Sequence, residues 1–212
     1  MTNLPSIGRF YGLARGPSAQ TLVASIAIQT LLAVSGIIAS RALGVEGRGT
    51  LAFLWLLPLM LVSFGGLGIP LATTYYVARD LKNARAVVLI SVKLTLGIAA
   101  LLTAAYASLL LVFTPVEGFS TVDASLSVAL VPALLALYVG NAVLQGSSRF
   151  KAFNAARISA PLLYAVSAAT LFGLDKADLT SILAAAVASW IAAAVMTWFL
   201  VLRHPPHTPE GR

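Results

Sequence analysis

The sequence predicts an all-α integral membrane protein, built as a bundle of six transmembrane helices. Hydrophobic residues make up 59% of the 212 residues and charged residues only 10%, and the mean hydropathy is +0.92. These values lie outside the range of soluble globular domains. The apolar residues also gather in six long runs, and most Lys and Arg residues lie in the short segments between those runs.

Each run reaches the ~20 residues that an α-helix needs to cross a bilayer. The predicted spans are residues 21–43, 50–78, 86–113, 125–144, 152–172 and 179–201. Together they form a predicted six-helix lobe over residues 21–203.

The two ends of the chain carry no predicted span. Residues 1–20 are predicted to be a cytoplasmic N-terminal segment, because the first run is longer than the core of a signal peptide and no clear cleavage site follows it. Residues 204–212 are rich in proline and polar side chains, so they are predicted to be a disordered cytoplasmic tail.

The second run predicts a bent helix. As one straight helix it would be roughly 43 Å long, well over the ~30 Å hydrocarbon core of a bilayer. Pro58 removes one backbone donor, and residues 65–70 contain three glycines and a proline. The break is either a kink packed against neighbouring helices or an irregular segment in the wall of a cavity.

The distribution of Lys and Arg predicts the orientation. Ten of these residues fall on one side of the array and three on the other, with Lys93 inside the third run, so both termini are expected in the cytoplasm and the protein in the inner (plasma) membrane. The larger group comprises Arg9, Arg15, Arg79, Lys82, Arg85, Arg149, Lys151, Arg157, Arg203 and Arg212, and the smaller comprises Arg41, Arg48 and Lys176.

Two local patterns predict packing roles. Asp123 and Asp178 each precede an apolar run, where a carboxylate can accept hydrogen bonds from the first free backbone N–H groups of a helix. Ala184, Ala188 and Ala192 recur every four residues and predict a close approach between helices.

Polar side chains at membrane depth are costly and therefore indicate candidate functional residues. Asn141, Gln145 and Arg149 recur every four residues, and Arg157 follows just inside the same boundary of the next run. These residues predict a polar, cationic mouth on the cytoplasmic side. In the alternative interpretation, the arginines reach lipid headgroups and the amides bond a neighbouring helix.

Two isolated polar residues lie inside other runs. Lys93 is expected to extend toward the headgroups rather than to be buried. Gln29, near the middle of the first run, is expected to form a hydrogen bond between helices, with a place in a cavity wall as the alternative.

The sequence offers no constellation for enzyme catalysis, and neither a metal nor a cofactor is expected. There is no cysteine, no H-E-x-x-H, no G-x-S-x-G and no Walker A motif, and the carboxylates lie in predicted loops, turns or tails. The net charge of +7 is explained by membrane topology, so no nucleic acid partner is expected. Movement of a solute is the activity that remains.

Several segments carry a resemblance to a known family. The first run ends in R-x-L-G (residues 41–44), the turn reads G-x-E-G-R-G (44–49), and the second run closes on Tyr-Tyr-Val-Ala-Arg (75–79). Residues 144–150 read L-Q-G-x-x-R-F. In these features the chain resembles the polysaccharide and O-antigen flippases of the multidrug, oligosaccharidyl-lipid and polysaccharide exporter superfamily.

The resemblance implies export of a polyprenyl-diphosphate-linked oligosaccharide in cell-envelope polysaccharide biosynthesis. Cations near the cytoplasmic mouth would attract the diphosphate, with Arg149 and Arg157 as first candidates and Arg79 and Lys93 behind them. Members of the family resemble two six-helix lobes, whereas this chain has one. It is therefore expected to be a fragment, a truncated gene product or a half-transporter that pairs with a second lobe or a second copy.

Two other functions remain open at this point. A multidrug-type exporter resembles the same superfamily, but it predicts carboxylates within the membrane. A non-transporting partner in the assembly of polysaccharide-synthesis complexes needs no cationic mouth.

Overall fold

The structure, a computed structural model, describes residues 17–81, 83–113 and 119–203. Five of the helices in these ranges are long and apolar enough to cross a membrane. The predicted tail 204–212 and most of the segment 1–20 lie outside the described residues. The helices of the described residues are α2 (Pro17–Gly65), α3 (Ile69–Arg79), α4 (Ala84–Phe113), α5 (Thr121–Gly146), α6 (Phe150–Gly173) and α7 (Leu179–Arg203).

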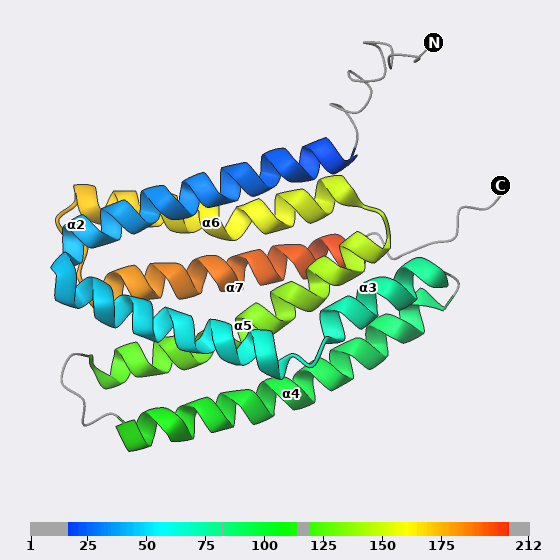
Figure 1. Cartoon of the computed structure of the whole chain (residues 1–212), viewed down its shortest axis with the longest axis horizontal. Helices are drawn as coiled ribbons and strands as arrows, with labels where there is room; N and C mark the ends of the chain where they lie inside the picture. Colours follow the sequence, from blue (N-terminus) through cyan, green and yellow to red (C-terminus); the bar gives the residue numbers. More distant parts are fainter. Residues whose placement is uncertain (1–16, 82, 114–118, 204–212) are drawn as a thin grey trace, which may run out of the picture.

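Helix α2 is interrupted at Gly44, whose backbone has φ 68° and ψ −169°. The chain reverses direction there, so residues 17–43 and 45–65 form a first and a second arm (Figure 1). The sequence predicts a turn over residues 44–49 between two spans. The structure makes that reversal at Gly44 and returns to helix directly after it.

The predicted break in the run 50–78 is confirmed at residues 66–68. The second arm ends at Gly65, Gly68 adopts a left-handed conformation with φ 71°, and α3 begins at Ile69 with Pro70 in its first turn. A proline is tolerated at this position because the first N–H groups of a helix have no partner within the helix.

Pro58 lies inside the second arm, and a side chain compensates for its missing donor. In a regular helix the N–H of residue 58 would donate to the carbonyl of Leu54. Because Pro58 has no N–H, that carbonyl has no donor within the helix. The Ser127 hydroxyl of α5 donates to this carbonyl, and the Tyr106 hydroxyl of α4 lies 2.7 Å from the Ser127 oxygen. These buried bonds connect the second arm to two other helices.

Helix α5 lies at the centre of the packing. It contacts α7 most extensively, followed by α4 and α3, while the first arm of α2 lies beside α6 (Figure 1). Gly140 permits the close approach of α5 and α7, since a Cβ there would lie 2.7 Å from the Thr197 methyl group. Gly146 permits the approach of α5 and α3, since a Cβ there would lie 2.7 Å from the Thr74 carbonyl oxygen.

Successive helical segments run in opposite directions (Figure 1). Most of the described basic residues therefore lie toward one end of the bundle. We call this the basic end: α2, α4 and α6 begin there, and α3, α5 and α7 end there. Its described cations are Arg79, Arg85, Arg149, Lys151, Arg157 and Arg203. The opposite end, the distal end, holds Arg41, Arg48 and Lys176. The predicted division of charge is therefore present in the fold.

The predicted cap of α5 is confirmed, whereas two related predictions have different outcomes. Asp123 forms a capping box with Ser120 and also accepts a bond of 2.7 Å from Thr180. Asp178 precedes α7, but within the described part of the chain its side chain makes no hydrogen bond. The stripe from Ala184 to Ala192 is half-buried to exposed, because α7 packs through a neighbouring face that contains Ala186 and Ala193.

Candidate functional site

A cavity of about 530 Å³ opens between helices toward the basic end. We call it the Arg157 cavity. Thr74, Tyr138, Asn141, Gln145 and Arg157, from α3, α5 and α6, contribute polar groups to its lining. Apolar side chains of the first arm, α3, α5, α6 and α7 form the rest of the wall. Three of the residues that the sequence assigns to a polar mouth are therefore brought together.

Arg157 lies half-buried in this wall and is held in place by two contacts. Its Nη2 donates to the Ser25 hydroxyl of the first arm at 3.3 Å, and its guanidinium lies 5.2 Å from the centre of the Phe153 ring. Among the described residues, no carboxylate lies within 4.0 Å of this guanidinium. A half-buried arginine without a counter-ion is costly at membrane depth and attracts an anion.

The two amides differ in their surroundings. Gln145 is exposed, and Asn141 is half-buried. The Asn141 carbonyl oxygen is buried and has no hydrogen-bond partner among the described residues. Leaving such an acceptor unpaired costs about 1–3 kcal/mol. An amide rotation that turned this oxygen toward the cavity would let a bound hydroxyl or N–H donor satisfy it.

Arg149 does not line the Arg157 cavity. Helix α5 ends at Gly146, so the four-residue spacing from Asn141 no longer describes one helical face at position 149. Arg149 instead occupies the N-cap position of α6, and its Nη1 donates to the carbonyl of Leu200 on α7 at 2.9 Å. The structure gives this residue a role in joining helix ends.

The other three predicted site residues also lie outside this cavity. Arg79 is exposed at the end of α3 and donates to the Tyr75 hydroxyl at 3.2 Å. Lys93 is exposed on α4. Gln29 is exposed on the first arm, and its side chain makes no hydrogen bond within the described ranges, so the expected interhelical bond is not found there.

A second cavity of about 320 Å³ lies nearer the distal end, between the two arms of α2 and α6. We call it the Arg48 cavity. Arg48, Trp55 and Tyr164 line it, and Leu32 lines both cavities. Sequence reasoning assigned Arg48 to an exterior turn and overlooked the aromatic residues. The spacing of seven between Arg48 and Trp55 places them on one helical face and was an available signal.

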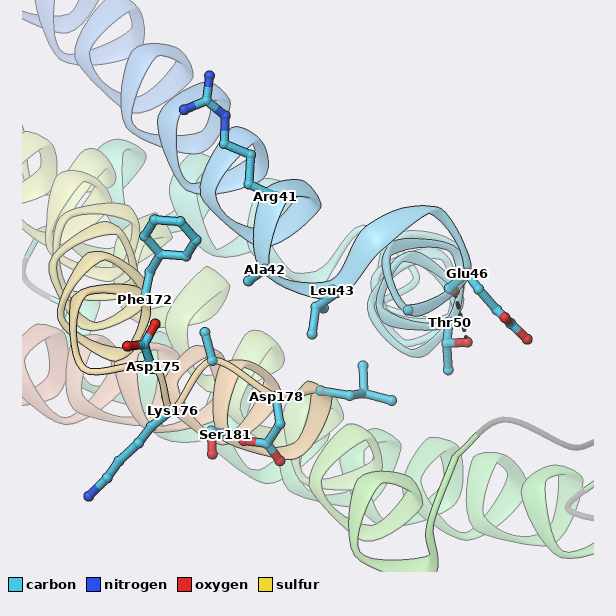
Figure 2. Close-up of a pocket in the computed structure, with 13 residues that line it drawn as sticks. Arg41, Ala42, Leu43, Glu46, Thr50, Phe172, Asp175, Lys176, Asp178 and Ser181 are labelled. Atoms are coloured by element: carbon cyan, nitrogen blue, oxygen red, sulfur yellow. Dashed lines mark hydrogen bonds between the residues drawn. The ribbon is translucent and has the colours of Figure 1, made fainter.

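A third cavity, of about 1020 Å³, lies at the distal end, and its charged groups do not converge. Figure 2 shows Arg41, Glu46 and Lys176 extending away from one another. Within the described residues, no group of three or more His, Asp or Glu side chains is placed to hold a metal ion. This cavity therefore offers no arrangement around a single ligand.

Comparisons of the chain with models of known protein families, with curated proteins and with solved structures found no match.

Proposed function

We propose that this chain is one six-span lobe of a membrane transporter that moves a lipid-linked, diphosphate-bearing saccharide across the membrane. The observation that carries the proposal is the Arg157 cavity. It combines an uncompensated guanidinium and two amides with an apolar wall, near the end of the bundle that is rich in cations. This combination suits a molecule with an anionic, hydroxylated head and an apolar tail.

The proposal counts the two arms of α2 as separate spans. At ~1.5 Å per residue, the 49 residues of α2 would extend roughly 74 Å if straight, more than twice the ~30 Å core of a bilayer. The reversal at Gly44 supports two crossings, and with α4 to α7 the lobe then has six spans. The basic end faces the cytoplasm in this proposal, since cytoplasmic loops carry the excess of Lys and Arg.

Residues 41–49, 75–79 and 144–150 resemble segments of flippases that transport lipid-linked saccharides. This resemblance supports a lipid-linked saccharide as the cargo. In this proposal Arg157 binds the diphosphate, and Asn141 and Gln145 contact polar groups next to it. A second lobe, supplied by another chain or another copy, completes the pathway. Arg149 supports the site by holding α6 to α7.

The described carboxylates favour an anionic cargo over a cationic one. Asp123 is the buried carboxylate of the described spans, with 3% of its surface exposed. Both of its oxygens already accept hydrogen bonds, from Ser120 and Thr180. A multidrug-type exporter needs a carboxylate that is free to bind a cation, and Asp123 does not provide one.

Reconstitution in liposomes tests the proposed function. The chain, alone or with a second lobe, is expected to move a labelled polyprenyl-diphosphate sugar between leaflets. Arg157→Gln is expected to slow this movement about tenfold or more, because a hydrogen bond to a charged group contributes about 1.5–3 kcal/mol. Arg85→Gln removes an exposed cation at the same end and is expected to leave the rate unchanged. Folded protein that moves no more sugar than empty vesicles would contradict the proposal.

A further inference from the structure

The Arg48 cavity contains a second arginine without a counter-ion. Arg48 is half-buried, and within the described part of the chain no carboxylate lies within 4.0 Å of it. Its Nη2 lies against the first arm, 3.8 Å from the position that a Cβ on Gly36 would occupy. The guanidinium is therefore held between the two arms. Since a half-buried guanidinium without a counter-ion is costly, it indicates a place for an anion.

Two aromatic rings, those of Trp55 and Tyr164, line this cavity together with Arg48, and a third ring packs on both of them. The Trp55 and Tyr164 rings are stacked, with centroids 5.8 Å apart, and the Trp190 ring meets Trp55 edge-on at 4.6 Å. These mutual contacts restrict the rings and stabilise their orientation. Trp55 and Tyr164 line the Arg48 cavity, and Trp190 lines the Arg157 cavity. The cluster thus separates two cationic sites.

Rigid aromatic surfaces next to polar groups are suited to binding a sugar ring. One face of a pyranose presents C–H groups that pack on an aromatic ring, while its hydroxyl groups remain available for hydrogen bonds. Arg48 adds planar donors that match a carboxylate or a phosphate substituent. A simple anion would bind Arg48, but it would gain no binding energy from packing on the rings.

We propose that the Arg48 cavity binds an acidic sugar residue of the transported saccharide, with its ring packed on Trp55, which Tyr164 backs, and its anionic substituent on Arg48. This inference rests on the proposed function, because it takes the cargo to be a saccharide. It assigns the cargo to the acidic class and places its sugar on the distal side of the Arg157 cavity.

Arg41 provides the matched comparison for Arg48. Both arginines lie near the reversal at Gly44, but Arg41 is exposed and extends away from the neighbouring charged groups (Figure 2). An arginine that only contacts lipid headgroups would resemble Arg41. The position of Arg48 between the arms, beside aromatic rings, favours a ligand inside the protein.

Tryptophan fluorescence can measure this binding without any transport. The chain has three tryptophans, and two of them belong to the aromatic cluster. Trp198 is the third; its Nε1 donates to the Ala136 carbonyl, and it lines neither cavity. Trp198→Phe protein therefore reports on Trp55 and Trp190. The probes are methyl glucuronide, neutral methyl glucoside and inorganic phosphate, each added to purified protein in detergent.

Methyl glucuronide is expected to change the fluorescence at about tenfold lower concentration than methyl glucoside. Arg48→Gln is expected to abolish this preference, Arg48→Lys to retain part of it, and Arg41→Gln to leave it intact. High salt is expected to weaken the preference in the unsubstituted protein, which gives a readout that does not depend on the folding of a variant.

Two results would overturn the inference. Equal binding of the acidic and neutral glycosides in the unsubstituted protein would remove the role of Arg48. If inorganic phosphate displaces methyl glucuronide at equal concentration, the cavity is an anion site that does not recognise the sugar ring. Because the proposed function is measured by sugar movement in liposomes, failure of that assay is distinguishable from failure of this one.

Discussion

At the residue scale, single buried polar groups connect segments that are distant in sequence. Ser127 is fully buried and lies between the carbonyl freed by Pro58 and the hydroxyl of Tyr106. A proline in one span is thus compensated by a serine 69 positions later in another. Such compensation is required in a membrane, where no water reaches an unpaired carbonyl.

Ser127→Ala is expected to lower the free energy of unfolding by about 1–3 kcal/mol, because it leaves the Leu54 carbonyl and the Tyr106 hydroxyl unpaired. Ser108→Ala is the control, since Ser108 is exposed and bonds only to the carbonyl of Ala104 in its own helix. The measurement is denaturant-induced unfolding in detergent micelles. Equal stability of the two variants would show that the buried bonds contribute nothing.

The candidate site illustrates what residue spacing can and cannot predict. Asn141 and Gln145 were expected to share a face and both line the Arg157 cavity. Arg149 continues the same spacing, but the helix has ended before it, and its side chain binds the end of α7. Periodicity predicts a shared face only as far as the helix continues, and helix ends are the least reliable part of a sequence-based prediction.

At the element scale, Gly44 determines whether α2 is one rod or two arms. Its φ and ψ lie in a region that is open almost only to glycine, and, apart from its chain neighbours and the adjacent helix backbone, no atom lies within 4 Å of where its Cβ would be. The constraint at this position is therefore conformational rather than steric crowding.

Gly44→Ala is expected to destabilise the fold by about 1–3 kcal/mol, since alanine must adopt a strained backbone conformation there. Gly49 is the control, because it also has open space around its Cβ position but lies in ordinary helix. Gly49→Ala is expected to leave stability unchanged or to raise it slightly. Thermal unfolding of the two variants in detergent, followed by size-exclusion chromatography, compares them. A stable Gly44→Ala protein beside a weakened Gly49→Ala protein would contradict this account.

At the scale of the whole molecule, the alternating helix directions and the basic end support a topology that can be measured directly. The chain contains no cysteine, so every introduced thiol is a unique label. Val45 is 95% exposed at the reversal, Lys176 is exposed at the distal end, and Lys151 is exposed at the basic end. All three sites accept a cysteine without loss of packing.

Val45→Cys and Lys176→Cys are expected to react with a membrane-impermeant maleimide added outside intact cells. Lys151→Cys is expected to react only after permeabilisation. Labelling of Val45→Cys from outside would place the reversal beyond the bilayer and support two crossings by α2. The opposite pattern, with only Lys151→Cys labelled from outside, would invert the orientation and put the Arg157 cavity at the far side.

Four properties can be predicted from the amino-acid sequence: the membrane class of the protein, the approximate helical segments, the break near residues 66–68 and the division of charge between two ends. These properties follow from local composition, chain length and backbone chemistry, which depend on residues close together in the sequence. Which polar residues lie together depends on the packing of the helices. This packing placed Arg157 in a cavity, fixed Arg149 to α7 and brought Arg48 beside the rings of Trp55 and Tyr164. The physical reason is that the surroundings of a side chain in a membrane bundle are set by helices distant in sequence, by where each helix ends and by how closely glycines let helices approach.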